Sequence, residues 1–468
     1  MENMSDDDKS STKRGVFESP YVVMVTLALG TFMMGLDSYI FSPSIVTIVH
    51  DLNTSYNWVT WTIMTYLIVA TVLMPLMGKL ADIYGRKRMF VLGVGIFTIG
   101  SFACSLSWNI LALLVFRGVQ AAGGSMIVPA AFAAMSSAAP ENKQGRTMGV
   151  LWAVTMIGPI IGPNIGGYVV QTFGWRFIFY INIPIGITAI ILAHAIHESH
   201  GTAKHHIDAI GALLLGGSLV ALLLGIINLE TVALTDVRVF PLFIVAGILL
   251  VAFVIYEKRA SEPIINMAVI SRGDILAFNL AMMTTIMGMT CIALFVPSFG
   301  QLVLKLSVQD SGTILTAYTG TIFVMSLVGG MLIDKLGAKP LMLAGLATSC
   351  FAFIGLALFG SNLLFLILLL IIAALGWGVV TNGFQVTILG ITPKSEKGSS
   401  SAILNTFRGI GGVFTPLIGG YFLSRQSSNV AFHSIFWTAA ILLVISIALV
   451  AYALVINRNA KISRQRNV

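Results

Sequence analysis

The chain has 468 residues, of which 57% are hydrophobic and 10% are charged, and its mean hydropathy is +0.92. A soluble core cannot bury that much apolar surface, so these values exclude a soluble globular protein. The formal net charge is +8, from 27 Lys and Arg against 19 Asp and Glu. The positions of these charges decide whether they indicate a nucleic-acid partner or a membrane topology.

Apolar stretches of roughly twenty residues recur along the chain, each long enough to cross about 30 Å of hydrocarbon as a helix. Lipid leaves backbone polar groups no water to bond, and the short alternating segments of a membrane barrel are absent from the sequence. We therefore predict an all-α polytopic membrane protein with about 14 transmembrane helices. In chain order they are expected at 20–49, 58–78, 89–108, 110–135, 147–171, 176–196, 207–229, 238–256, 275–299, 312–333, 340–360, 362–390, 401–424 and 431–456.

The opening residues 1–20 are polar and lack a short apolar core with a cleavage site, so the first helix is expected to stay attached. If this segment is cytoplasmic, most Lys and Arg residues lie on the cytoplasmic side, including those of the tail 457–468. This bias predicts a multi-pass plasma-membrane protein with both termini in the cytoplasm and no nucleic-acid partner. The exceptions are Arg176, Arg238, Lys305 and Arg425 outside, and Arg117 and Arg408 within helices.

The three cysteines, Cys104, Cys291 and Cys350, lie in apolar stretches at unrelated spacings, which indicates neither a disulfide framework nor a metal site. The sequence contains no HExxH, GxSxG or P-loop motif. We therefore expect no enzyme activity, no cofactor and no bound metal.

An internal repeat divides the chain. The loop after the second helix and the loop after the tenth share five residues at one spacing, 252 positions apart. A pattern of three Gly and one Pro in the fifth helix recurs 253 positions later in the thirteenth. Parallel halves are a common transporter design. The expected segments are a cytoplasmic segment 1–20, a six-helix bundle 21–199, two inserted helices 200–260, a second six-helix bundle 261–456 and a basic tail 457–468.

Asp37 is a carboxylate inside the apolar stretch 21–49. A charge there costs at least about 2.5–3.5 kcal/mol, so it should line a cavity, find a partner or hold a proton. Burial disfavours the charged form and a nearby cation favours it, so a group that alternates between the two can carry a proton. Arg117, always ionised, is the expected electrostatic partner. We predict that Asp37 and Arg117 couple transport to protons; the alternatives are a structural Asp37 and an Arg117 bonded to backbone carbonyls.

The repeated loop predicts a conformational latch, because glycines allow close helix contacts while Asp82 and Arg86 can bond neighbouring helix ends. An ordinary positive-inside loop would account for Lys87 but not for the repetition. The predicted latch residues are Gly78, Asp82, Gly85, Arg86 and Lys87, with Gly330, Asp334, Gly337 and Lys339 in the second half.

The fifth helix carries small residues at four-residue intervals and a proline, which indicates close packing with a bend. A seal against ion leakage and generic helix packing are both compatible with this pattern. The residues are Gly158, Gly162, Pro163, Gly166 and Gly167.

Polar and aromatic residues near helix centres are candidates for a substrate cavity. Aromatic and Met side chains suit hydrophobic molecules of varied shape, and Asp37 would favour cations. An interfacial aromatic belt is the alternative role for the two tryptophans. The candidates are Asp37, Trp58, Trp61, Tyr66, Gln120, Asn279, Gln301, Asn382, Gln385 and Asn405.

These motifs resemble those of the major facilitator superfamily and, within it, the fourteen-helix drug:proton antiporter family. Residues 78–88 resemble the loop motif between helices two and three, and 113–123 resemble the fourth-helix motif. Residues 158–167 are similar to the fifth-helix motif associated with antiporters, and 175–186 resemble the entry to helix six of the fourteen-helix branch. The sequence after Asp37 departs from the family pattern, with Ser38, Tyr39, Ser42 and Pro43 in place of the usual Thr, Asn and a later Pro.

The resemblance implies a monomeric secondary active transporter that exports hydrophobic or cationic small molecules in exchange for protons. The two halves would rock about a cavity at the middle of the membrane. The altered residues after Asp37 favour an alternative, a narrow-specificity metabolite or organic-anion carrier that could be a proton symporter. The partners implied are a small-molecule substrate, protons and membrane lipid.

Overall fold

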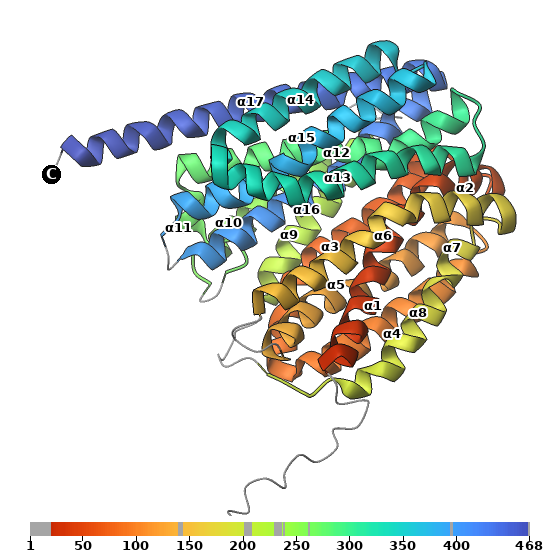
Figure 1. Ribbon diagram of the computed structural model, residues 1–468, viewed down its shortest axis with the longest axis horizontal. Helices are drawn as coiled ribbons and strands as arrows, with labels where there is room; N and C mark the ends of the chain where they lie inside the picture. The colour runs from red at the N-terminus through yellow and green to blue at the C-terminus, as the bar shows by residue number, and fades with distance from the viewer. Residues whose placement is uncertain are drawn as a thin grey trace, which may run out of the picture.

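The computed structural model describes residues 20–138, 144–200, 208–228, 236, 239–260, 263–393 and 396–466, and every regular element among them is a helix. Figure 1 shows two helical bundles lying at an angle to each other. The first bundle consists of α1 (Pro20–Ile40), the 3-10 turn η2 (Ser42–Ser44), α2 (Ile45–Asp51), α3 (Tyr56–Tyr84), α4 (Arg86–Ser105), α5 (Ile110–Ala138), α6 (Gln144–Phe173), α7 (Phe177–Tyr180), α8 (Asn182–Leu192) and η4 (Ala193–Ala195).

Two further helices, α9 (Ala209–Asn228) and α10 (Phe240–Glu257), lie in the sequence between the bundles. They correspond to the predicted insertion 200–260, whose boundaries stay a prediction. The second bundle consists of α11 (Met267–Ile270), α12 (Gly273–Leu302), α13 (Val308–Leu336), α14 (Ala338–Phe359), α15 (Leu363–Ile391), α16 (Lys397–Arg425) and α17 (Ser428–Arg466).

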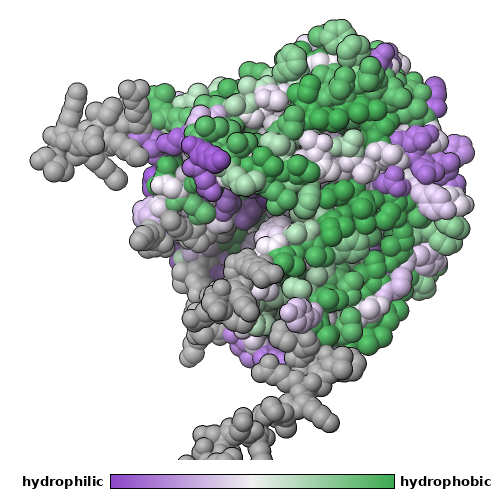
Figure 2. Space-filling model, viewed as in Figure 1, coloured by the Kyte–Doolittle hydropathy of each residue, from purple (hydrophilic) through white to green (hydrophobic). Residues whose placement is uncertain are grey.

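The helices form a membrane-spanning protein. Over the described residues, 13 helical spans are long and apolar enough to cross a membrane. The remaining predicted span, 401–424, is present as α16, which packs against α3 and α12. Figure 2 shows hydrophobic side chains spread over both bundles, with hydrophilic ones gathered at the edges of the view. The prediction of an all-α polytopic membrane protein with about 14 helices is confirmed.

Two predicted elements differ in the structure. The first helix is not continuous over 20–49 but ends at Ile40 and resumes at Ile45 after η2. Pro43 lies in this interruption, and a proline has no N–H to donate to a helix. At the other end, α17 continues ten residues beyond the expected limit at 456, so much of the basic tail 457–468 is helical. The predicted segment 1–20 lies almost wholly outside the described residues.

The internal repeat is visible in the helices themselves. α3 spans Tyr56–Tyr84 and α13 spans Val308–Leu336, so both ends of the helix recur 252 positions later. Each is followed by a glycine with positive φ, +108° at Gly85 and +88° at Gly337. An L-residue with a Cβ rarely adopts such a conformation, so the repeated glycine allows each chain to turn sharply into α4 or α14.

The two bundles are joined where α1 ends and α3 begins, which we call the closed end. Nε2 of Gln301 in α12 donates to the carbonyl of Pro43 (2.9 Å), and Nδ2 of Asn164 in α6 donates to the hydroxyl of Thr313 in α13 (2.8 Å). One continuous apolar core includes buried side chains of both bundles at this end. The repeated glycines Gly85 and Gly337 lie at the opposite ends of the same helices.

Of the two inserted helices, α9 packs against both bundles. Leu223 of α9 lies in one apolar cluster with Met64 of α3 and Val413 of α16. Further along, Leu215 packs with Ile403 in a second cluster. α9 therefore lies over the seam at which α3 meets α16, and α10 packs on its outer side (Figure 1).

Candidate functional site

A buried ion pair lies inside the first bundle. Nη1 of Arg117 in α5 donates to Oδ2 of Asp37 in α1 across 2.8 Å, and the two side chains are only 3% and 1% exposed. Burial of two charges is tolerated only when they are paired and further hydrogen-bonded. The two residues that the sequence places 80 positions apart are thus direct partners.

Amide side chains complete the hydrogen bonding of this pair. Nε2 of Gln120 and Nδ2 of Asn182 both donate to Oδ1 of Asp37, at 2.9 and 3.1 Å. Oε1 of Gln120 accepts from Arg117 at 2.8 Å, and both amides also donate to the hydroxyl of Ser101. We call these five residues the charged cluster. Its carboxylate accepts three hydrogen bonds, which suits the ionised form.

Aromatic rings enclose the guanidinium of Arg117. Its central carbon lies 4.4 Å from the ring centre of Tyr66, 4.9 Å from that of Phe41 and 5.8 Å from that of Phe179. Such rings stabilise a cation through their negative faces. Nε of Arg117 is buried and has no hydrogen-bond partner among the described residues. The arginine is therefore held by one carboxylate, one amide and three ring faces.

Over its described residues, the second bundle has no counterpart of this cluster. The positions 252 residues after Asp37 and 253 after Arg117 are Met289 and Leu370, and both are buried in an apolar core. Tyr318 repeats Tyr66, but its hydroxyl bonds only the backbone carbonyl of Met289 at 3.4 Å. The same fold therefore packs without charges at these positions.

The glycine-rich helix α6 packs tightly on α1, the helix that carries Asp37. A Cβ on Gly166 would lie 2.5 Å from the carbonyl oxygen of Ile40, and one on Gly158 would collide with the backbone at Leu36. Gly162 leaves slightly more room, with 3.3 Å to the nearest atom of α1. The last turns of α1 and the C-terminal half of α6 are thus held at backbone distance by the glycines at four-residue spacing.

The opposite face of α6 contacts the second bundle. A Cβ on Gly167 would lie 2.8 Å from the carbonyl oxygen of Val308, and Gly312 of α13 packs directly on the carbonyl of Pro163. α16 repeats this arrangement, since Gly411 faces α12 and Gly420 faces α3. α6 therefore connects Asp37's helix to the closed end.

The predicted latch residues lie at the other end of the first bundle. Arg86 donates through Nε and Nη2 to Oδ1 of Asp82 (2.9 and 2.7 Å), and through Nη1 to the carbonyl of Ala133 (3.1 Å) and the hydroxyl of Ser137. These partners belong to α3 and α5 of one bundle. Gly78 and Gly330 differ from expectation, because added Cβ atoms there would meet nothing closer than 3.5 Å. Neither glycine holds its helix in close contact with a neighbour in this state, and the latch role stays a prediction.

Glu198 contributes to the same region, although sequence analysis did not select it. Its carboxylate oxygens accept from the backbone N–H groups of Lys87 (3.0 Å) and Arg88 (3.3 Å) in the first turn of α4. The side chain of Lys87 donates to the carbonyl of His194 at 3.3 Å. Carboxylates favour helix N-termini, and this was the only signal that could have identified Glu198. The signal is not visible in the sequence because Glu198 is 111 residues away from Lys87.

The structure distributes the predicted cavity residues over several places. Asp37, Tyr66 and Gln120 lie at the charged cluster, whereas Gln301 contacts Pro43 at the closed end. Trp58 is 44% exposed at the start of α3, Trp61 packs in the apolar cluster between α3, α9 and α16, and Asn279 is fully buried in α12. Asn382 donates to the carbonyl of Ser326, whereas Gln385 and Asn405 donate to the hydroxyl and the carbonyl of Ser401.

Ser101 and Asn182 are cluster members that the sequence analysis missed. Asn182 stands inside the residues 175–186 that carry the helix-six resemblance, and this was the available signal. A second missed contact is at the closed end, where Asp51 accepts from Nε1 of Trp175 (2.7 Å) and from Arg176 (2.5 Å).

Comparisons with known proteins agree with this architecture. A family model of the major facilitator superfamily matches the chain over residues 27–303 and again over 278–467. The chain is 30% identical to the multidrug transporter protein MdtP of Bacillus subtilis (strain 168), covering 89% of this chain and 78% of that protein. It is 29% identical to the riboflavin transporter RibZ of Clostridioides difficile (strain 630), covering 88% and 91%. The crystal structure of a D-xylose-proton symporter superposes with a TM-score of 0.65 at 14% identity, covering 90% of this chain and 97% of that one.

Two helical bundles with repeated sequence, joined at one end and carrying a buried charge pair, define a membrane carrier. The chain belongs to the major facilitator superfamily and, within it, to the fourteen-helix drug:proton antiporter family. It is a multi-pass membrane protein that carries small-molecule substrates.

Proposed function

We propose that this protein exports hydrophobic or cationic small molecules in exchange for protons, as a monomer in the plasma membrane with both termini in the cytoplasm. The observation that supports this most is the charged cluster, which is present in one bundle and replaced by Met289 and Leu370 in the other. Because the fold packs without these charges, their presence in the first bundle favours a function over a structural need.

The cluster supplies a chemical basis for proton coupling. If Asp37 takes a proton, Arg117 loses its only carboxylate partner while its guanidinium stays buried. The hydrogen bonds from Gln120 and Asn182 suit the ionised carboxylate, so protonation weakens them as well. Proton binding at Asp37 therefore favours a rearrangement of α1 against α5.

The closed end determines which side of the membrane the substrate path reaches. With both termini cytoplasmic, the closed end faces outward, and this structure corresponds to an inward-facing state. Export then requires the closed end to open and the opposite ends of α3 and α13, where Gly85 and Gly337 lie, to close. α6 can relay the change, since one face packs on α1 and the other on α13.

The test is proton release from inside-out vesicles whose interior has been acidified, upon addition of a panel of lipophilic cations. We expect the unmodified protein to release protons with several of these compounds and Asp37→Asn to release none. Asp310→Asn is the matched control, because it makes the same chemical change at an exposed residue in the first turn of α13. Full release by a correctly inserted Asp37→Asn would contradict the assignment of coupling to Asp37.

A narrow-specificity carrier is the second candidate, and the relationship to the riboflavin transporter RibZ favours it. Such a carrier would leave the vesicles silent across the cation panel while transporting one chemical class. Proton uptake together with substrate, rather than release, would identify a symporter.

A further inference from the structure

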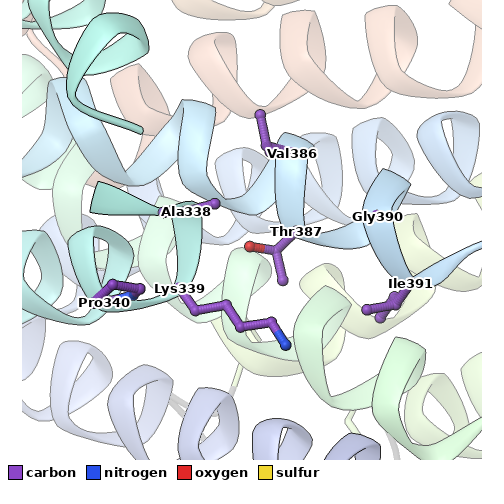
Figure 3. A pocket seen from close by; sticks show the side chains of 8 residues that line it. Ala338, Lys339, Pro340, Val386, Thr387, Gly390 and Ile391 are labelled. Carbon is purple, nitrogen blue, oxygen red and sulfur yellow. The ribbon is translucent and has the colours of Figure 1, made fainter. Parts of the chain in front are cut away.

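A pocket of about 330 Å³ lies at the latch end of the second bundle, between the first turn of α14 and the last turns of α15. Figure 3 shows the side chains of Lys339 and Thr387 bordering it together with Ala338. The pocket is remote from the charged cluster, and two residues of its lining, Gly337 and Lys339, belong to the predicted latch. Its lining is Gly337, Ala338, Lys339, Pro340, Val386, Thr387, Gly390 and Ile391.

The internal repeat explains why there is space here. In the first bundle the corresponding volume is filled by the side chain of Arg86, which bonds Ala133 and Ser137 of α5. Ala338 stands 252 positions after Arg86, and Val386 and Gly390 stand 253 positions after those two partners. Replacement of arginine by alanine therefore leaves a pocket where the first bundle has a guanidinium.

Comparison with the first bundle also shows that the N-terminus of α14 should bind a negatively charged group. The N-terminus of α4 is covered by the carboxylate of Glu198, which accepts from two backbone N–H groups. Among the described residues, no side chain accepts from the first turn of α14, where Ala338 and Lys339 carry backbone N–H groups and Pro340 carries none. The free N–H groups of a helix N-terminus attract an anion in the same way that Glu198 is held.

Two side chains bring further donors to this terminus. Thr387 is 4% exposed, and its hydroxyl is buried with no hydrogen-bond partner among the described residues. Figure 3 shows that this oxygen points toward α14. Lys339 supplies a positive charge at the rim. An unpaired buried hydroxyl costs free energy that a ligand oxygen would recover.

The other charged groups that the structure describes nearby do not occupy the pocket. Arg272 donates to the carbonyl of Ile391 at 3.2 Å and pairs with Asp274 at 3.1 Å, so the exposed carbonyl end of α15 is already covered by a cation. Asp334 is exposed and is not part of the lining. The donors at this site, the hydroxyl of Thr387 and the backbone N–H groups of α14, therefore need a hydrogen-bond acceptor.

We propose that this pocket binds a phosphate group, held by the backbone N–H groups of Ala338 and Lys339, the hydroxyl of Thr387 and the ammonium of Lys339. Two sources share this chemistry: the headgroup of a phospholipid in the surrounding leaflet and a soluble phosphate compound. The bound anion takes the place at α14 that Glu198 takes at α4.

Binding to the purified full-length protein in detergent tests the proposal without any transport assay. The probes are inorganic phosphate, dioctanoyl phosphatidylglycerol, and dioctanoylglycerol, which lacks the phosphate. Thr387→Val removes the hydroxyl but keeps the side-chain shape, and we expect it to weaken binding about tenfold. Lys339→Gln is expected to weaken it roughly threefold, whereas Lys335→Gln, an exposed lysine outside the lining, leaves it unchanged.

The outcomes separate the sources. Binding of phosphatidylglycerol but not of inorganic phosphate identifies a lipid headgroup site, and binding of inorganic phosphate identifies a site for a soluble anion. The proposal is overturned if neither phosphate probe binds, if dioctanoylglycerol binds equally well, or if Thr387→Val and Lys339→Gln bind as tightly as the unmodified protein. Equal melting temperatures of the variants without ligand show that they are folded.

Discussion

Asp37 and Arg117 form a buried ion pair that is stabilising only while both partners are present. The free-energy cost of desolvating the two charges is offset by their mutual attraction and by the hydrogen bonds from Gln120 and Asn182. Met289 and Leu370 show that apolar side chains fill the same positions in the second bundle. This difference suggests an experiment in which the residues of the second bundle are placed at the matching positions of the first.

We expect Arg117→Leu alone to destabilise the protein by about 3–5 kcal/mol, because it leaves Asp37 as an unpaired buried charge. The double variant Asp37→Met with Arg117→Leu reproduces the residues of the second bundle and should regain most of that stability. Both variants should lack proton-driven transport. Thermal unfolding of the purified proteins measures the first effect and vesicle assays the second. A double variant as unstable as Arg117→Leu would show instead that the cluster is structural.

The sequence predicted the charged members of this site but not its full composition. Asp37 and Arg117 are conspicuous because charges are costly in apolar segments. Ser101 is not, because a small hydroxyl in a membrane helix commonly bonds its own backbone. The cavity candidates failed to gather in one place for a related reason: residue type does not reveal which face of a helix Asn279 or Trp58 occupies.

At the scale of elements, α6 contacts two surfaces that move together in the proposed mechanism. Gly158 and Gly166 hold it against α1, and Gly167 holds it against α13. In the proposed mechanism, a displacement of α1 on protonation of Asp37 would reach the other bundle through this one helix. This supports a role of the glycine pattern in coupling as well as in the predicted seal.

Gly166→Val should destabilise the protein by about 1–3 kcal/mol and impair transport, because its Cβ would overlap the backbone at Ile40. Gly149→Val is the control: it lies in the same helix and has open space around it, so it carries the same change in helix propensity without the clash. Melting temperature and transport rate are measured for both. Equal effects of the two substitutions would show that helix propensity, not the α1 contact, matters at Gly166.

Helix positions were predicted closely because apolar runs are bounded by glycine, proline and charged residues. α3 and α13 are each several residues longer than expected, since their last turns are amphipathic and continue to Gly85 and Gly337. The break at η2 was missed although Pro43 marks it, because a proline inside a long, mainly apolar run is also compatible with one kinked transmembrane helix.

For the whole molecule, the structure shows two bundles joined at one end, with α9 laid across their seam. The repeat offsets predicted two related halves. They could not predict which ends are in contact, because a transporter sequence encodes several states and the contacts at the two ends differ between them.

A cross-link at the closed end should stop transport. Asn164 and Thr313 bond each other across the bundles at 2.8 Å, so cysteines at both positions can be joined by oxidation or by a short thiol reagent. The three native cysteines, Cys104, Cys291 and Cys350, are buried and would be replaced first. We expect activity to disappear on cross-linking and to return on reduction, while each single cysteine stays active. Full transport by the cross-linked protein would exclude rocking about this end.

The apolar core that continues from one bundle to the other at the closed end has a thermodynamic consequence. Opening this end would expose part of this shared apolar core to water. Hydration of apolar surface carries a positive heat capacity, so the balance between the two states curves with temperature instead of following a straight van't Hoff line. Cooling weakens the apolar adhesion that keeps this end shut. The resting orientation of the carrier would therefore depend on the temperature at which its membrane operates.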